Sequence, residues 1–126
     1  MLARGQGGRV VNISSINAMV AGQDIRGRHY ETAEAAVRQF TRAVTADWAP
    51  HGITVNAVCP GLFMTEANQR RSREKPEVID GIVRRTPMDT TGDPRDLRTL
   101  AVYLASDASR FMTGAALVID GGYTLW

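Results

Sequence analysis

The chain has 126 residues, 44% of them hydrophobic and 22% charged, which is typical of one globular domain. The formal net charge of +2 is too small to indicate nucleic-acid binding. A single cysteine excludes an internal disulfide and fits a reducing, cytoplasmic environment. No segment reaches the roughly 18 consecutive apolar residues of a membrane helix, and residues 1–5 lack the apolar core of a signal peptide. We therefore expect no membrane association.

The first predicted strand covers residues 9–14, where Val10, Val11 and Ile13 form a nearly continuous β-branched run. Such a run is typical of a strand that is buried on both faces. Ser15 follows at the carboxyl end of this strand, which is where open parallel sheets bind ligands. Ser15 is therefore a candidate to bind a substrate oxygen.

A long helix is predicted over residues 30–49, with Tyr30 in its first turn and Glu34 one turn later on the same face. Its apolar residues recur at steps of three and four, which predicts a stripe that packs mainly in the core. This stripe consists of Ala33, Ala36, Val37, Phe40, Val44 and Trp48. Pro50 and Gly52 then end the helix.

A second strand is predicted over residues 53–58 and leads into Cys59-Pro60-Gly61. Proline fixes the backbone here, and glycine permits close approach of the backbone to a ligand. We interpret Cys59 as a small buried hydrophobic residue and not as a nucleophile, because no convincing pair of histidine and carboxylate accompanies it.

Residues 62–91 have the least regular pattern. The basic run 70–75 is interpreted as a solvated helix face, with the alternative that one arginine meets an acidic substrate such as a sugar acid or an acyl-phosphopantetheine. Val78, Ile79, Ile82 and Val83 predict a short amphipathic helix.

A last helix is predicted over residues 94–106, with Asp93 as its N-cap and Pro94 in its first position. A third strand is predicted over residues 115–119. Because strands and helices alternate along the chain, the expected fold class is α/β with a parallel sheet.

Four groups of residues together resemble the short-chain dehydrogenase/reductase family, and only the C-terminal half of that family's domain. They are Asn12-Ile13-Ser14-Ser15, Tyr30-x-x-x-Glu34, Asn56-Ala57-Val58-Cys59-Pro60-Gly61 with Thr65, and Tyr103-Leu104-Ala105-Ser106-Asp107 through Thr113-Gly114 to Asp120-Gly121-Gly122. The resemblance implies that residues 1–126 form a partial Rossmann-like, doubly wound sheet, namely the last three strands and their helices. The glycine-rich dinucleotide loop and the catalytic asparagine of the family have no counterpart in the chain.

The resemblance also implies an activity, which is NAD- or NADP-dependent hydride transfer to or from the carbonyl or alcohol carbon of a small molecule. Ser15 would bind the substrate oxygen, Tyr30 would exchange its proton, and Pro60, Gly61 and Thr65 would contact the cofactor. No metal ligand is implied. In the family the helix of the tyrosine also pairs subunits, so a homo-oligomer is expected, with small residues of helix 30–49 at the contact.

The spacing of the two catalytic candidates leaves an alternative open. Ser15 and Tyr30 are fifteen residues apart, which is longer than is usual in the family, so we infer two extra residues within 21–29. Asn17 is the rival for the position of the family serine.

Glu34 departs from the family pattern, which has a lysine at this position. A lysine there favours the ionised tyrosine and binds the nicotinamide ribose, whereas a carboxylate opposes both effects, so we expect impaired proton transfer. Three hypotheses remain. The chain is a truncated relative with little or no turnover, an enzyme with another proton route through Arg28 or Arg38, or a non-catalytic binding or dimerisation module.

Overall fold

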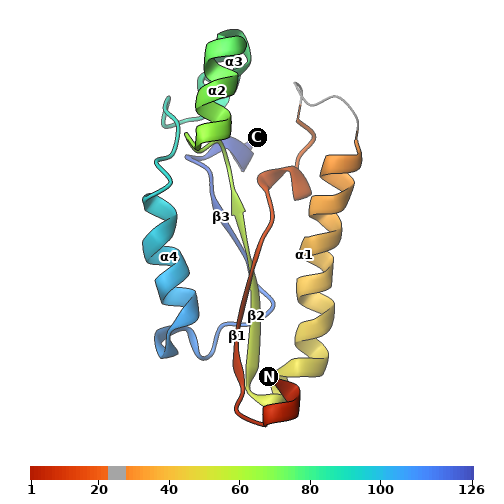
Figure 1. Cartoon of the computed structure of the whole chain (residues 1–126). Coiled ribbons are helices and arrows are strands. Elements are labelled where there is room, and N and C mark those ends of the chain that lie inside the picture. The colour runs from red at the N-terminus through yellow and green to blue at the C-terminus, as the bar shows by residue number, and fades with distance from the viewer. Residues whose placement is uncertain (23–27) are drawn as a thin grey trace.

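The computed structural model describes residues 1–22 and 28–126. Three parallel strands, β1 (Gly8–Ile13), β2 (Ile53–Pro60) and β3 (Ala116–Ile119), form one sheet in the order β1-β2-β3. Helix α1 (His29–Trp48) covers one face and α4 (Asp96–Ala105) covers the other, while α2 (Glu66–Glu74) and α3 (Pro76–Arg85) lie beyond the carboxyl ends of the strands (Figure 1). The predicted α/β class with a parallel sheet is confirmed.

Five short 3-10 helices complete the described elements, and two of them matter for the site. They are η1 (Leu2–Arg4), η2 (Ile16–Ala18), η3 (Ala49–His51), η4 (Asp107–Ser109) and η5 (Tyr123–Leu125). η2 follows the carboxyl end of β1, and η5 follows the carboxyl end of β3.

The short amphipathic helix predicted from Val78 to Val83 is confirmed within α3. The insertion inferred within 21–29 falls mainly on residues 23–27, outside the described residues.

The core is centred on β2, which pairs with both other strands. Gly8 to Ile13 pair in register with Ile53 to Val58, and Ala57 to Pro60 pair with Ala116 to Ile119. Val55, Ala57 and Cys59 have no exposed surface. Because β2 is flanked on both edges and covered on both faces, it has the continuous apolar character of a central parallel strand.

β1 differs from its prediction, because it is not buried on both faces. Its residues are only half-buried, and the side chain of Ile13 is 65% exposed. Among the described residues β1 pairs with β2 alone, so its other edge is open. The local sequence is that of a buried strand, and the neighbour that would bury it is not among the described elements.

The apolar stripe predicted for α1 is only partly buried. Val37, Val44 and Trp48 are half-buried, but Ala33, Ala36 and Phe40 are exposed, so the core prediction was wrong for these three residues. The face that α1 turns to the sheet is more polar than the predicted stripe. On this face the Thr41 hydroxyl oxygen accepts a hydrogen bond from the Asn12 amide at 2.9 Å. Thr45 on the same face donates to the backbone oxygen of Val55 at 3.3 Å. These polar contacts with the strands help to orient α1.

The predicted start of the last helix was two residues too early. α4 begins at Asp96, because Asp93, Pro94 and Arg95 form a turn ahead of it. The Asp93 carboxylate accepts a hydrogen bond from the Arg95 backbone at 2.8 Å, and the Asp96 carboxylate accepts one from the Asp93 backbone at 3.0 Å. The Arg95 guanidinium beside Asp93 lowers the pKa of that carboxyl to about 2. Asp93 thus caps the turn that precedes the helix.

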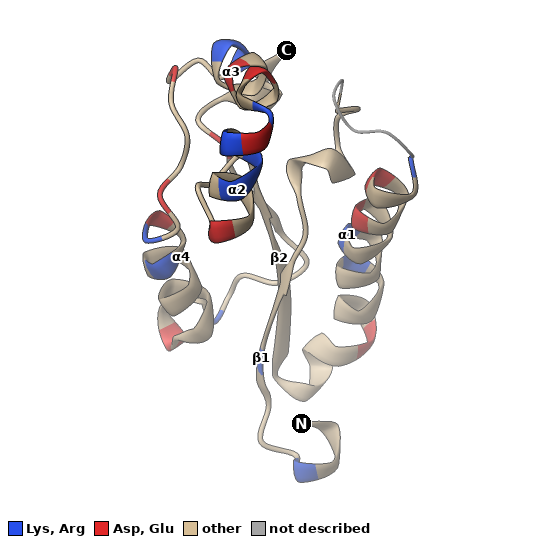
Figure 2. Ribbon diagram, turned by 45° about the horizontal axis from the view of Figure 1, so that its top comes forward, with Lys and Arg blue, Asp and Glu red and all other residues tan. Residues whose placement is uncertain are grey.

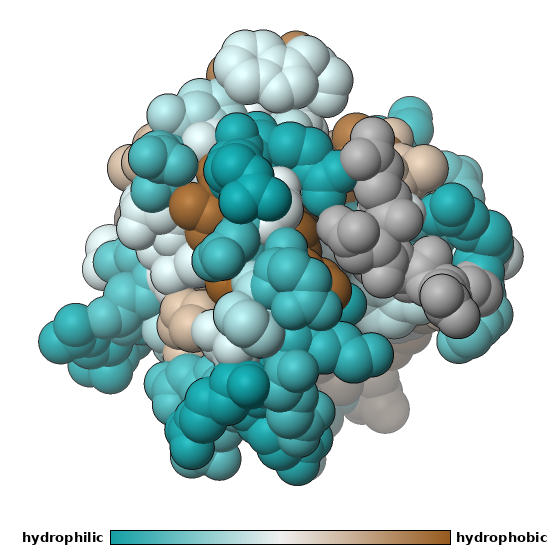
Figure 3. Space-filling view, turned by 90° about the horizontal axis from the view of Figure 1, so that it is seen from above, coloured by the Kyte–Doolittle hydropathy of each residue, from teal (hydrophilic) through white to brown (hydrophobic). Residues whose placement is uncertain are grey.

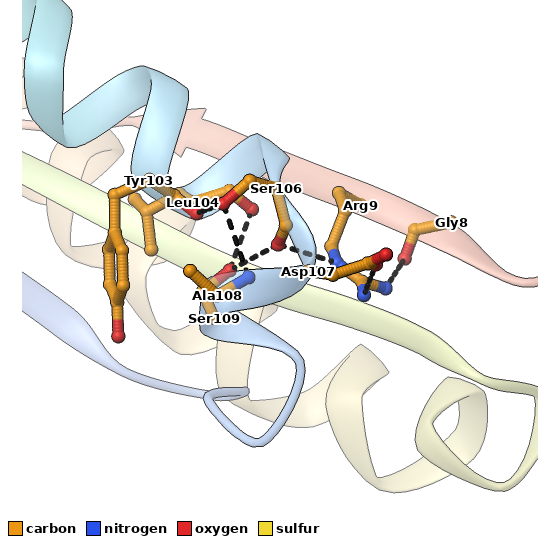
Figure 4. Close-up of polar contacts among 8 residues, drawn as sticks. All are labelled: Gly8, Arg9, Tyr103, Leu104, Ser106, Asp107, Ala108 and Ser109. Atoms are coloured by element: carbon orange, nitrogen blue, oxygen red, sulfur yellow. Dashed lines mark hydrogen bonds and ion pairs between the residues drawn. The ribbon is translucent and has the colours of Figure 1, made fainter.

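The end of α4 is joined to β1 by a polar cluster (Figure 4). Arg9 forms an ion pair with Asp107 at 3.1 Å and donates a longer hydrogen bond, 3.5 Å, to the backbone oxygen of Ser106. The buried Ser109 hydroxyl donates to the backbone oxygens of Leu104 and Ser106, each at 3.1 Å. The motif from Tyr103 to Asp107 therefore has a structural role, far from the carboxyl ends of the strands.

Candidate functional site

A cavity of about 320 Å³ lies at the carboxyl ends of the strands. Its described lining comes from Ser15 and η2, from Gly22 further along, and from the start of α1, the turn after β2, the helices α2 and α3, and η5. Seen from above, this end of the molecule shows apolar side chains between hydrophilic ones (Figure 3). The cavity has the position that ligands take in open α/β sheets.

Ser15 reaches the cavity because β1 ends just before it. The Ser14 backbone N–H donates to the Val58 oxygen at 2.8 Å, which extends the pairing of β1 and β2 to the edge of the site. The Ser15 hydroxyl oxygen then accepts a hydrogen bond from the Asn17 backbone N–H at 3.1 Å and caps η2. Ser15 and its rival Asn17 both line the cavity, so the structure leaves both available for the role of the family serine.

Tyr30 lines the same cavity from the first turn of α1 and is 41% exposed. The start of the helix is anchored by Glu31, whose carboxylate accepts hydrogen bonds from Arg28 and from the Gly22 backbone N–H, both at 2.7 Å. Both contacts lower the pKa of the Glu31 carboxyl, and the contact with Arg28 has the larger effect. The ionised Glu31 therefore ties the segment after η2 to the helix that carries Tyr30.

Gly61 is the cofactor candidate that lines the cavity. A Cβ atom at this position would lie 2.8 Å from the Cα atom of Asp120, so a side chain does not fit. Pro60 is the last residue of β2, and Thr65 caps α2 by accepting a hydrogen bond from the Asn68 backbone at 3.4 Å. Neither Pro60 nor Thr65 belongs to the described lining of this cavity.

Glu34 does not belong to that lining either. Its backbone oxygen accepts a hydrogen bond from the Ser14 hydroxyl at 3.1 Å, which places this turn of α1 against the end of β1. Among the described residues, its side-chain Oε2 atom is buried without a hydrogen-bond partner, and the same holds for the Nε atom of Arg38. Buried polar atoms are rarely left in this state, so the region around Glu34 lacks a partner group.

Three further residues of the lining were not singled out as site residues from the sequence. Arg71 comes from α2, Arg85 from the end of α3 and Tyr123 from η5. The basic run contained Arg71, but its favoured interpretation was a solvated face, which holds for the exposed Arg70 and Arg73. No sequence motif pointed to Arg85 or Tyr123. Arg85 reaches the cavity from the end of α3, and the turn after β3 brings Tyr123 back to it.

Cys59 is fully buried in β2, and burial raises the pKa of its thiol. A protonated, inaccessible thiol is a poor nucleophile. The interpretation of Cys59 as a buried hydrophobic residue therefore agrees with its position.

The cavity combines a serine hydroxyl, a phenol and two guanidinium groups. The hydroxyl can donate a hydrogen bond to a substrate oxygen, and the phenol can exchange a proton with it. Within residues 1–22 and 28–126, no three potential metal ligands gather at one place. No helix in the same ranges is long and apolar enough to span a membrane.

Known proteins have similar sequences over nearly the whole of this chain. The family model described as enoyl-(acyl carrier protein) reductase matches residues 1–124. A galactitol 2-dehydrogenase (L-tagatose-forming) of Cereibacter sphaeroides is 40% identical over 126 residues, which cover 100% of this chain and 49% of the relative. The chain spans about half the length of the curated relatives it matches.

Solved structures of dehydrogenases are also similar to this chain. A putative 2-deoxy-D-gluconate 3-dehydrogenase of Agrobacterium tumefaciens with bound NADP is 35% identical, with a TM-score of 0.90, and the match covers 99% of this chain and 50% of that one. A gluconate 5-dehydrogenase of Burkholderia cenocepacia in complex with NADP and tartrate is 38% identical, with a TM-score of 0.89 and coverages of 99% and 48%.

The fold, with its cavity at the carboxyl ends of the strands, is that of a partial Rossmann-like α/β domain. The chain belongs to the short-chain dehydrogenase/reductase family. Its relatives include oxidoreductases of small alcohols and ketones, and several structural neighbours contain NADP.

Proposed function

We propose that this chain is the C-terminal half of an NAD(P)-dependent oxidoreductase domain that acts on a small alcohol or carbonyl compound. The observation that carries the proposal is the common cavity of Ser15, Tyr30 and Gly61 at the carboxyl ends of β1 and β2. In this role Ser15 binds the substrate oxygen and Tyr30 exchanges the proton, with Asn17 as the alternative to Ser15.

The chain's own residues fit the nicotinamide end of a dinucleotide. Gly61 presents backbone without a side chain at the cavity, and Pro60 and Thr65 flank the same turn after β2. The nicotinamide, when bound, accepts or supplies the hydride. The chain has no glycine-rich turn for the pyrophosphate, so this part of the cofactor needs another segment.

Two features support the proposal that a preceding half completes the domain. The outer edge of β1 is open among the described residues. The buried Glu34 Oε2 and Arg38 Nε atoms also lack partners there, beside the same strand end. An added segment next to β1 would supply both a strand neighbour and hydrogen-bonding groups. We therefore propose that the 126-residue chain has little or no turnover when it is alone.

The test is a fusion of the first half of a related dehydrogenase to this chain, compared with the same fusion carrying Glu34→Lys. We expect the lysine version to turn over at least roughly 100-fold faster, which is the low end of what general acid–base catalysis contributes. Tyr30→Phe should abolish the activity that the lysine restores.

The controls for this experiment are Glu66→Lys, an equal charge change on the exposed start of α2, and direct titration of NAD(H) and NADP(H). Equal turnover of the two fusions would show that position 34 does not tune Tyr30, and a proton route through Arg28 or Arg38 would replace this explanation.

A second candidate function is a non-catalytic dimerisation module. The observation that favours it is the exposed apolar surface of α1, where Phe40 is 54% exposed near Ala33 and Ala36. Cofactor titration of the completed domain separates the two functions, since an oxidoreductase must bind NAD(P)(H) and a dimerisation module need not.

A further inference from the structure

We propose that the cavity selects substrates that carry a carboxylate, which the guanidinium groups of Arg71 and Arg85 bind. This inference rests on the proposed function and specifies its substrate class as small hydroxy- or oxo-carboxylic acids.

The charge of the cavity is the first argument. Arg71 and Arg85 are both half-buried and line the cavity together with Ser15 and Tyr30. Among the described lining residues, Arg71 and Arg85 are the charged ones, and both are cationic. The basic residues of α2 and α3 lie beyond the carboxyl end of the sheet, interspersed with acidic ones, as Figure 2 shows.

Arg71 has the properties of an anion-binding residue. Arg9, Arg28 and Arg95 each form an ion pair with a carboxylate. In contrast, within the part of the chain that the structure describes, no ion pair joins Arg71 to a carboxylate. A half-buried guanidinium without an acidic partner favours an anionic ligand, because a charge in such a place is stabilised by a counter-charge.

Arg85 is held in place by an aromatic ring. Its guanidinium carbon lies 5.8 Å from the ring centre of Tyr123, in cation–π geometry. Such a contact uses the face of the guanidinium, whereas hydrogen bonds to a carboxylate use its edge. Tyr123 is itself fixed at the cavity, because the Asp120 carboxylate accepts hydrogen bonds from the Gly122 and Thr124 backbones, each at 2.8 Å.

The arrangement gives the substrate a direction. Ser15 and Tyr30 come from β1 and α1, while Arg71 and Arg85 come from the helices beyond the strands. A hydroxy acid would place its reacting carbinol or carbonyl oxygen at Ser15 and Tyr30 and its carboxylate at the arginines. A cavity of about 320 Å³ suits a small molecule. The apolar lining residues Ile16, Leu62 and Ile82 strengthen the charge interaction by excluding water.

The experiment is a calorimetric titration of the fusion protein with D-gluconate and, separately, with D-glucitol. The two ligands share a six-carbon polyol chain, but glucitol has a hydroxymethyl group where gluconate has its carboxylate. We expect saturable binding of gluconate that weakens as salt is added, and at least tenfold weaker binding of glucitol. Arg71→Gln and Arg85→Gln should each lower the affinity for gluconate at least tenfold and leave that for glucitol unchanged.

The matched controls are Arg73→Gln and Arg84→Gln, which remove the same charge from exposed positions on the same two helices. They should change gluconate binding by less than twofold. Arg85→Lys serves if Arg85→Gln does not fold, because it keeps the charge but loses the bidentate geometry, and it too should weaken binding.

Three outcomes would overturn the inference. They are no binding of gluconate, equal affinity for the two ligands, and equal losses in the test and control variants. The proposed function is tested separately, by turnover of the fusion protein. If the fusion protein oxidised neutral polyols as fast as it oxidised hydroxy acids, the proposed function would stand and the equal turnover would count, like equal affinity, against the carboxylate site.

Discussion

Asn56 illustrates how one polar side chain holds the third strand in place. The residue is only 1% exposed, in the middle of β2. Its amide donates to the Met112 backbone oxygen at 2.9 Å, and its side-chain oxygen accepts from the Ala115 backbone N–H at 3.1 Å. These two contacts replace strand pairing for the segment just before β3. The sequence marked Asn56 only as part of a family motif, and its role depends on where residues 112–115 lie in the fold.

We predict that Asn56→Ala lowers the free energy of unfolding by about 1–3 kcal/mol, because it leaves a buried backbone donor and a buried backbone acceptor without partners. Urea unfolding at one fixed protein concentration measures the change. Gln69→Ala is the control, because this exposed amide donates a hydrogen bond to the Met64 backbone oxygen, and its loss should cost less than about 0.5 kcal/mol. An equal loss in both variants would contradict this account of Asn56.

At the scale of elements, α4 is held by packing on one side and by ion pairs and hydrogen bonds at its ends. Leu104 is 1% exposed, whereas Val102 on the same helix is 65% exposed. The contacts of Arg9 with Asp107 and Ser106 fix the end of the helix against β1 (Figure 4). The helix was predictable because its apolar residues have a helical period. Its start was not, since the Asp96 carboxylate accepts from the Asp93 backbone and the Asp93 carboxylate from the Arg95 backbone, in a separate turn.

We predict that Leu104→Ala destabilises the protein by about 2–5 kcal/mol, the range for removing a fully buried leucine side chain. Val102→Ala should change stability by less than about 0.5 kcal/mol. Thermal and urea unfolding of both variants provide the measurement. A comparable loss in Val102→Ala would mean that another surface covers this face of α4.

At the scale of the whole molecule, the described helices and strands leave apolar surface exposed on β1 and α1. Among residues 1–22 and 28–126, the outer edge of β1 is unpaired and carries the 65% exposed Ile13, and the 54% exposed Phe40 lies on α1. An open apolar strand edge is a site of association between chains. The edge follows from the sheet order and cannot be read from β1 itself.

We therefore predict that the 126-residue chain self-associates or unfolds readily at micromolar concentration. Ile13→Lys and Phe40→Lys should shift sedimentation towards smaller species, because a charge disfavours burial at each surface. Arg70→Lys, an exposed substitution that keeps the charge, is the control. A monodisperse, cooperatively melting monomer before any substitution would refute the prediction.

The sequence by itself determined the class of fold, the succession of the three strands with α1, α3 and α4, and the motifs of the family, because β-branched runs, helical periods and short motifs are local properties. Only the tertiary structure decided which faces are buried. α1 turns Thr41 and Thr45 to the sheet and leaves Phe40 exposed, since contacts with Asn12 and Val55 orient it.

The site divides in the same way. Ser15, Tyr30 and Gly61 were predictable because each stands at the start or end of an element with a recognisable motif. Arg85 and Tyr123 were not, because they reach the cavity only after α3 and η5 fold over the ends of the strands. A cavity wall is built from segments that are distant in the chain, so its charge is a property of the folded molecule and not of any one segment.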